Sequence, residues 1–317
     1  MSAAPLRRST LVRGARRLLG ALLLSAALVP AAGATFESWV TTHKIPVGDS
    51  VTLAVEYVQQ HGSGFFDGVS TAVRVSTDLV QALLEATPAP VLIAVVALIA
   101  FWVRRSWLVT LFVAAALLFI VNQGYWAATL ETTTLVLVAA TVSTVIGVPL
   151  GIVAARRPRL YAAMRPVLDL MQTLPTFVYL TPTLVLFGLG VVPGLISTII
   201  FALPAPIRLT HLGISSVPRA LIEAGEAFGA TRLQLLVKVE LPSAMPTIVA
   251  GITQCIMLSL SMVVIAALVG AGGLGVPVVR ALNTVQVGTG FEAGIAIVLL
   301  AIILDRIARP AEQGERP

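Results

Sequence analysis

The side chains best suited to covalent or metal chemistry are few and scattered. The one cysteine, Cys255, lies inside an apolar run, and the three histidines, His43, His61 and His211, are far apart in sequence. A lone cysteine cannot form an internal disulfide, and histidines at these spacings do not match a zinc site. We therefore expect no metal site and no catalytic residues, because no nucleophile–base pair for an intramembrane enzyme is visible.

The composition indicates that a lipid bilayer surrounds much of the chain. Hydrophobic residues make up 57% of the 317 residues and charged residues only 11%, whereas an average soluble domain has about 25% charged residues. So few charges cannot cover a soluble fold of this length. The net charge of +6 comes from short basic clusters between apolar runs, a pattern typical of cytoplasmic loops and not of a nucleic-acid-binding face. We therefore expect a membrane protein with no nucleic-acid partner.

Six or seven apolar stretches after residue 87 are candidate membrane spans. They lie near residues 88–103, 106–122, 129–154, 172–189, 194–212, 247–269 and 290–304. Some are short or contain proline, and such breaks are tolerated only where the freed backbone groups face protein or a water-filled path. The sequence therefore predicts an all-α fold, a polytopic bundle of transmembrane helices.

The distribution of basic residues predicts the orientation. If the N-terminus is inside, 18 of the 21 lysines and arginines fall in inside segments. The three outside residues are Lys44, Arg74 and Arg280. Because positive residues collect on the cytoplasmic side, this asymmetry favours eight spans, or seven if the first apolar stretch is cleaved.

The N-terminal third divides into three segments. Residues 1–34 combine arginines, an apolar stretch and an A-x-A pattern, which fits either a cleaved secretory signal or a retained anchor helix. Residues 35–88 hold six acids and two bases, so they are too polar to span, and an amphipathic helix on the outer membrane face is expected near their end. Residues 89–124 hold two candidate spans.

The inside loop of residues 213–246 is the longest non-spanning stretch after the first hundred residues. It predicts a helix that starts after Pro218 and stops at Gly229, since glycine readily adopts the conformation that ends helices. A second helix is predicted from Thr231, its N-cap, to the Leu241-Pro242 pair that ends it. Such a hairpin can dock into a groove of another protein, or it can be a solvated hairpin without a partner.

This loop resembles the EAA loop of ABC importer permeases. The family motif runs Glu-Ala-Ala, three residues, Gly, nine residues, Ile, any residue, Leu-Pro. At the same spacing the chain carries Glu223, Ala224, Gly225, Gly229, Val239, Leu241 and Pro242. Glycine replaces the third alanine and valine replaces isoleucine. The resemblance implies a type I ABC importer permease fold over residues 125–305, a cytoplasmic tail over 306–317, and a loop that docks on a cytoplasmic ATPase subunit.

Further stretches are similar to the permeases that import glycine betaine, proline betaine and choline. They are Pro149–Ile152, Leu168–Tyr179, Ile199–Pro204, Pro242–Ile248, Leu260–Ala266, Gly272–Gly275 and Ala301–Arg306. The resemblance implies a small quaternary ammonium solute, most often glycine betaine. It also implies a bacterial inner-membrane assembly of two permeases, two ATPase subunits and a periplasmic binding protein. Because the chain lacks the G-x-x-x-x-G-K-[ST] phosphate loop, we expect no cofactor in it and ATP on the partner subunit.

Three residues are candidates for the translocation path. Gln172 and Gln254 are polar residues in or near membrane segments, where polar groups are costly and often functional. Tyr179 offers an aromatic face, and a quaternary ammonium is attracted to such a face by roughly 0.5–2 kcal/mol. Packing in the bundle is the alternative role for each of them.

The expected mechanism is alternating access, in which ATP-driven closure of the ATPase pair moves the docked loops and the broken spans. Three alternatives stay open at this point. An ion-coupled secondary transporter explains broken helices equally well, but carboxylates for ion coupling are nearly absent from the spans. An intramembrane enzyme lacks a reactive constellation, and a permease for another small solute, such as methionine or a sulfonate, stays within the same family.

Overall fold

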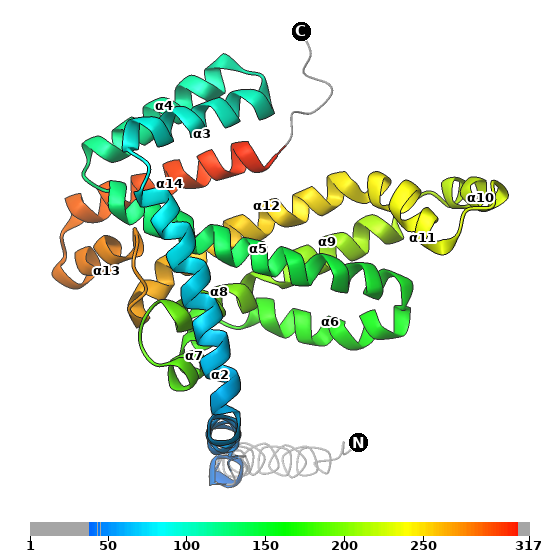
Figure 1. Ribbon diagram of the computed structural model, residues 1–317. Helices are drawn as coiled ribbons and strands as arrows, with labels where there is room; N and C mark the ends of the chain where they lie inside the picture. Colours follow the sequence, from blue (N-terminus) through cyan, green and yellow to red (C-terminus); the bar gives the residue numbers. More distant parts are fainter. Residues whose placement is uncertain (1–37, 43, 45, 310–317) are drawn as a thin grey trace, which may run out of the picture. The chain divides into compact units, whose positions relative to one another are not determined.

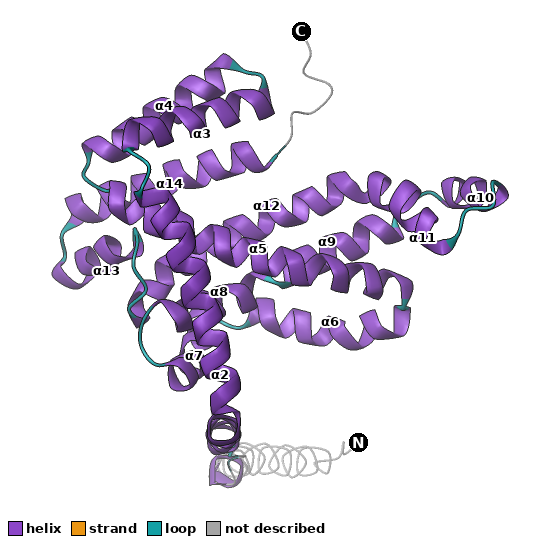
Figure 2. Cartoon of the chain, viewed as in Figure 1, coloured by secondary structure: helices purple, strands orange, loops and turns teal. Residues whose placement is uncertain are grey.

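The computed structural model describes residues 38–42, 44 and 46–309, and every regular element among them is helical (Figure 2). Contacts divide the chain into two units, Met1–Tyr57 and Val58–Pro317. In the first unit, residues 38–42 are helical and α2 (Val47–Glu85) begins. The predicted signal or anchor segment of residues 1–34 and most of the predicted tail lie outside the described residues.

Helix α2 is 39 residues long, so the amphipathic helix expected near the end of residues 35–88 is part of a longer element. Within the second unit, Val73 and Val80 pack against the buried core, and the rings of Phe66 and Phe187 meet edge to face at 5.3 Å. The outward face carries four exposed apolar side chains, Phe65, Val75, Leu79 and Leu83. A helix with one apolar face on protein and another facing outward suits contact with lipid.

Four helices form the central part of the second unit (Figure 1). They are α5 (Trp126–Arg156), α8 (Val191–Ala202), α9 (Pro204–Ser215) and α12 (Leu241–Ala266). Small residues let their backbones approach closely: a Cβ added to Gly147 would lie 2.7 Å from Pro206, and one on Gly151 would lie 2.6 Å from Thr210. Glycine at contacts between membrane helices is expected, because close van der Waals packing drives helix association in lipid.

A second group consists of α3 (Ala89–Arg104), α4 (Trp107–Asn122) and α14 (Val287–Ala308), which contact one another (Figure 1). Helices α3 and α4 form a tight hairpin in which Arg105 adopts the left-handed conformation with φ 47°. The contact surface is apolar, with Ala100, Val113 and Ala296 fully or almost fully buried. Helices α3 and α4 coincide with the two accessory spans predicted over residues 89–124.

One predicted span is a sharp bend. Helix α6 (Pro158–Thr173) is followed by the 3-10 turn η1 (Thr176–Tyr179) and by α7 (Leu180–Phe187), and the axis bends by 108° at the break. Pro175 opens the turn, and the Tyr179 hydroxyl donates a hydrogen bond to the Met171 carbonyl at 2.5 Å. The break therefore satisfies one of the α6 end carbonyls within protein, as a broken span requires.

Among the described residues, four helical stretches are long and apolar enough to cross a membrane, or up to six if each of two bent pairs is one span. The bent pairs are α2 with α3 and α6 with α7, and α4 is a shorter apolar helix. Each candidate span predicted from residue 88 onward overlaps one of these elements. The predicted total, eight spans or seven if the first apolar stretch is cleaved, counts each bent pair and the short helix α4 as a full crossing.

Candidate functional site

The inside loop lies between α9 and α12 and forms a compact hairpin (Figure 1). It consists of α10 (Arg219–Ala227), α11 (Arg232–Leu235) and the π-helical segment η2 (Leu236–Glu240), which continues into α12. We call residues 219–240 the coupling hairpin.

Gly229 ends α10 through a hydrogen-bonded cap. Its φ is +75°, its N–H donates to the Glu226 carbonyl at 2.9 Å, and the Ala230 N–H donates to the Gly225 carbonyl at 3.1 Å. These two bonds form a Schellman motif, which glycine accommodates without steric cost. The prediction that the first helix stops at Gly229 is confirmed.

Thr231 begins the second helix with a capping box. Its hydroxyl accepts a hydrogen bond from the Gln234 N–H at 3.3 Å, and its own N–H donates to the Gln234 side-chain oxygen at 2.8 Å. Two backbone donors that would lack partners at a helix start are thereby satisfied. The prediction of Thr231 as N-cap is confirmed, and two caps, at Gly229 and at Thr231, fix the turn of the hairpin.

Gly225 is the point at which the two arms of the hairpin touch. A Cβ added there would lie 2.5 Å from Leu235 and 3.6 Å from Val239, and Leu235 is buried. The glycine that departs from the EAA pattern therefore leaves room for a leucine of the second arm. This contact accounts for the departure in terms of packing between the arms.

The prediction that Leu241-Pro242 ends the second helix is wrong. The helix runs from Arg232 through Leu241 into α12, forming a continuous stretch of 38 residues. Segment η2 makes this possible, because the Leu241 N–H bonds to the Leu236 carbonyl five residues back. A π turn skips one carbonyl, so Pro242, which has no N–H to donate, can follow without leaving the helix broken.

The outer surface of the coupling hairpin is exposed and partly apolar. None of the α10 residues is buried, and Phe228 at the tip is 91% exposed. Three further apolar side chains of the hairpin are exposed, Leu221, Leu233 and Val237. Glu223 is also exposed and forms only a loose pair with Arg219 at 3.8 Å. A short helix with an exposed apolar tip and a free acidic face is suited to docking in a groove of a partner.

An ion pair that the sequence did not reveal joins the coupling hairpin to α5. The Arg156 guanidinium lies 2.9 Å from the Glu240 carboxylate and also donates to the Arg232 carbonyl at 3.3 Å. The Glu240 side chain is only 13% exposed. Glu240 occupies the position that the EAA motif leaves open to any residue. The available signal was an acid at the end of the loop and an arginine at the end of a span.

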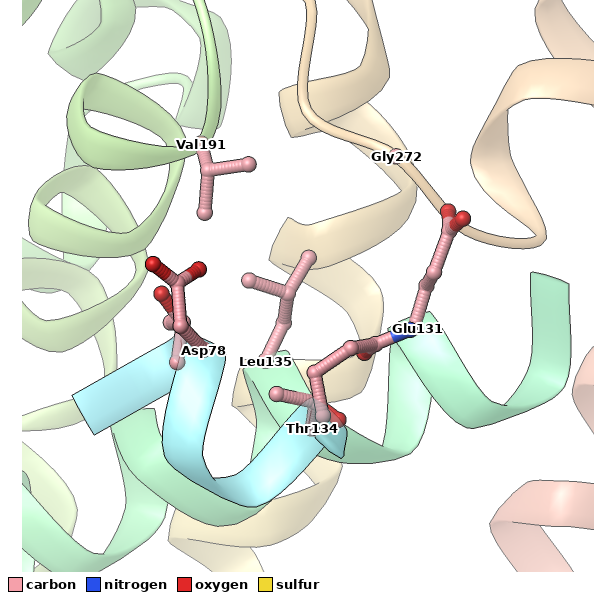
Figure 3. A pocket seen from close by; sticks show the side chains of 8 residues that line it. Asp78, Glu131, Thr134, Leu135, Val191 and Gly272 are labelled. Atoms are coloured by element: carbon pink, nitrogen blue, oxygen red, sulfur yellow. The ribbon is translucent and has the colours of Figure 1, made fainter. Parts of the chain in front are cut away.

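The opposite end of α5 holds a glycine-rich loop between α12 and α13 (Gly275–Thr284). The Gly273 N–H donates to the Glu131 carboxylate at 2.5 Å, and the Leu274 N–H donates to the Thr132 hydroxyl at 2.8 Å. Figure 3 shows Glu131 reaching toward Gly272, with Asp78 on the other side of a cavity of about 280 Å³. We call residues 270–275 the outer glycine loop.

The three candidates for the translocation path lie in different surroundings. Gln172 is exposed near the end of α6. Tyr179 is buried among apolar side chains and uses its hydroxyl to close the α6 break. Gln254 lines an open cavity of about 550 Å³ beside α9 and α12. No hydrogen bond joins these three described residues to one another, so their role in a path stays a prediction.

The sequence of this chain is similar to those of known proteins. The family of binding-protein-dependent transport system inner membrane components matches residues 147–316. The glycine betaine transport system permease protein OpuAB of Bacillus subtilis is 46% identical over 266 residues, which cover 84% of this chain and 94% of that protein. The glycine betaine/proline betaine transport system permease protein ProW of Escherichia coli is 47% identical over 277 residues, 86% of this chain and 77% of that protein.

A solved structure shares the fold. An inward-facing conformation of the MetNI methionine ABC transporter aligns with a TM-score of 0.51 and 26% sequence identity. The alignment covers 56% of this chain and 92% of the matched chain. The shared part is therefore almost the whole of that chain and a little over half of this one.

Proposed function

The chain belongs to the family of ABC importer permeases, as a multi-pass subunit of the bacterial inner membrane, and we propose that its solute is glycine betaine or a related quaternary ammonium compound. As a member of this family it is a transport subunit and not an enzyme, and it works with an ATPase and a substrate-binding protein. The proposal for the solute is supported by two relatives at 46% and 47% identity that carry glycine betaine in their names. Proline betaine and choline are chemically close alternatives.

The energy for import comes from ATP bound and hydrolysed by a separate subunit, and this chain itself carries no cofactor. Two copies of the permease line one path between them, and each presents a coupling hairpin to one ATPase subunit. The exposed tip at Phe228 and the face that carries Glu223 enter the cleft of the ATPase. Closure of the ATPase pair then moves both hairpins and opens the path toward the loaded binding protein, and hydrolysis resets it inward.

The observation that carries the coupling role is the shape of the hairpin. Its exposed tip stands on two caps, at Gly229 and Thr231, and on the contact between Gly225 and Leu235. A rigid hairpin transmits motion better than a flexible loop, because less of the displacement is lost in local rearrangement. The second arm of the hairpin continues without interruption into α12. A displacement of the tip is therefore transmitted to a helix that crosses the membrane.

The coupling role is tested in proteoliposomes that contain the chain with its ATPase and binding protein. We expect Glu223→Lys and Gly229→Asp to lower ATP-driven uptake at least tenfold while insertion stays normal. Arg159→Glu is the control, because it reverses an exposed charge near the α5–α6 turn outside the coupling hairpin. Unchanged uptake in both hairpin variants would contradict the coupling role.

The solute is tested separately by competition. Uptake of labelled glycine betaine should fall when unlabelled proline betaine or choline is added, and methionine should have no effect. Competition by methionine alone would assign a different solute to the same permease. Uptake by the purified chain without any ATPase subunit would instead indicate an ion-coupled secondary transporter.

A further inference from the structure

The cavity of about 280 Å³ beside the outer glycine loop has a polar lining that comes from two helices. The polar residues are Thr77, Asp78 and Gln81 from α2 and Glu131 and Thr134 from α5. All of them belong to the second unit of the chain. Among the described residues that line the cavity, there is no lysine, arginine, histidine or aromatic side chain. We call it the α2–α5 cavity.

Two carboxylates face the α2–α5 cavity from opposite sides, Asp78 from α2 and Glu131 from α5 (Figure 3). In the part of the chain that the structure describes, no ion pair involves either of them. Glu131 accepts one hydrogen bond through Oε2, from the Gly273 N–H. A carboxylate has about four acceptor sites, and a neutral N–H leaves its charge uncompensated. A cation is therefore the complementary ligand of this cavity.

A buried hydroxyl of the same cavity lacks a hydrogen-bond partner. Thr134 is 2% exposed, and its Oγ1 has no partner among the described residues. The hydroxyls of Thr129 and Thr133 on the same helix bond to carbonyls four residues back. Leaving such a group unpaired costs about 1–3 kcal/mol. Because Thr134 lines the cavity, a ligand bound there supplies the missing partner.

The size and chemistry of the lining favour a hydrated divalent cation. One water takes up roughly 30 Å³ in the liquid, so the cavity has room for an ion with several of its waters. Mg²⁺ keeps several waters and is usually bound by one or two carboxylates. A quaternary ammonium group favours aromatic faces instead, and the lining offers none.

The sequence led us to expect no metal site because its cysteine and histidines do not form a zinc site. Hard cations differ from zinc, since they take oxygen ligands from carboxylates, carbonyls and water. The described residues contain no group of three or more Asp, Glu, His or Cys side chains that could hold a metal ion. A site with two carboxylates therefore depends on water for most of its ligands.

We propose that the α2–α5 cavity binds one hydrated divalent cation such as Mg²⁺ from the outer side of the membrane. Asp78 and Glu131 hold the ion from opposite sides, and the Thr134 hydroxyl bonds to its water shell. The ion offsets the repulsion between the two carboxylates and links α2, through Glu131, to the outer glycine loop. It is a structural ion and takes no part in ATP hydrolysis.

The test is a titration of the full-length chain in an uncharged detergent with Mn²⁺, which takes the same oxygen ligands as Mg²⁺. Electron paramagnetic resonance measures the free Mn²⁺, and about 100 mM NaCl screens weak surface binding. We expect one saturable site per chain, from which Mg²⁺ displaces Mn²⁺. Asp78→Asn should weaken binding about tenfold, because the charge of the ligands tunes affinity for such ions.

Two further variants examine the other side of the cavity. Glu131→Gln keeps a side-chain oxygen that can accept from the Gly273 N–H, and it should also weaken binding about tenfold. Thr134→Val removes a hydroxyl that has no partner among the described residues, so the fold should be retained. Its effect on Mn²⁺ affinity should be smaller, about two- to threefold, the loss of one hydrogen bond to a bound water.

Asp67→Asn is the matched control, because Asp67 is an exposed aspartate of the same helix and lies outside the cavity. Equal losses in Asp67→Asn and Asp78→Asn would overturn the proposal, since binding would then reflect total charge. Absence of a saturable site would overturn it too. So would displacement of Mn²⁺ by choline as effectively as by Mg²⁺, which would indicate a site for organic cations. The chain is measured alone, so each result is independent of the coupling role and of the transported solute.

Discussion

The two ends of α5 are joined to the rest of the permease by different kinds of contact. At the inner end, one side-chain pair links Arg156 to Glu240, and the Arg156 side chain is 37% exposed. At the outer end, Glu131 and Thr132 hold backbone N–H groups of the outer glycine loop. Both ends connect α5 to the two extremities of α12, because the coupling hairpin precedes that helix and the outer glycine loop follows it.

We call the contact at the inner end of α5 the inner joint and the contact at its outer end the outer joint. The difference between them indicates which one can move. An ion pair between two side chains can break and re-form when the hairpin is pushed, because the Arg156 side chain is 37% exposed and water can solvate it once it leaves Glu240. The outer joint has no such freedom, because a Cβ on Gly272 or Gly273 would collide with Glu131 or Thr132. We infer that α5 is held in a fixed position at its outer end, and that its contact with the coupling hairpin at the inner end can change.

The first test adds a methyl group at the outer joint, in the outer glycine loop. Gly273 has φ +97° and no room for a Cβ beside Thr132. Gly273→Ala should lower the free energy of unfolding by about 2–5 kcal/mol, because overpacking costs about 1–3 kcal/mol and the left-handed conformation about 1–2 kcal/mol. The measurement uses a thiol-reactive dye, since the single cysteine, Cys255, is fully buried until the chain unfolds.

Gly124→Ala is the control for this test. Gly124 also has a positive φ, +77°, but a Cβ there would meet nothing within 4 Å, and its N–H donates to the Val121 carbonyl in a cap at the end of α4. Its cost should be about 1 kcal/mol, from backbone conformation alone. Equal effects at the two glycines would mean that the outer glycine loop is not held tightly.

The second test removes one acceptor at the same joint. Thr132→Val leaves the buried Leu274 N–H without its partner, which should cost about 1–3 kcal/mol in the same assay. Thr133→Val is the matched change one residue along, where the hydroxyl bonds only to a carbonyl of its own helix. That variant should stay within about 0.5 kcal/mol of the wild type.

The third test measures the interaction energy of the ion pair at the inner joint with a double-mutant cycle. Arg156→Gln, Glu240→Gln and the double variant should give a coupling energy of about 0.5–1 kcal/mol, reduced in 1 M salt. The loose Arg219–Glu223 pair provides the comparison and should give close to zero. A coupling energy as large as the effect at Gly273 would contradict the idea that the inner joint is the mobile one.

The smallest expected effect on unfolding of the whole bundle comes from a change within the coupling hairpin. Gly229→Ala meets no steric contact and should destabilise the local cap by about 1 kcal/mol, the cost of the left-handed conformation, with Gly229→Asn milder. Amide hydrogen exchange should speed up in residues 219–240, while dye labelling of Cys255 should not change. Faster labelling of Cys255 would show that the hairpin and the bundle unfold together.

Short-range features of the coupling hairpin were predictable because each depends on a few neighbouring residues. Gly229 and Thr231 form their caps with partners three to five residues away. The Leu241-Pro242 stop failed for a local reason that sequence rules did not include, the π-helical segment η2. The packing role of Gly225 was not predictable from the sequence either, because it depends on where the Leu235 side chain packs.

The sequence by itself determined that this chain lies in a membrane and where the coupling hairpin bends, and it predicts which way the chain faces. Those properties follow from composition, from the distribution of basic residues and from local backbone preferences. Only the tertiary structure decided how α5 is held, because Arg156 and Glu240 are 84 residues apart and Glu131 and Gly273 are 142 apart. A polar residue at the end of a span has many possible partners, and the packing of α5, α9 and α12 selects one.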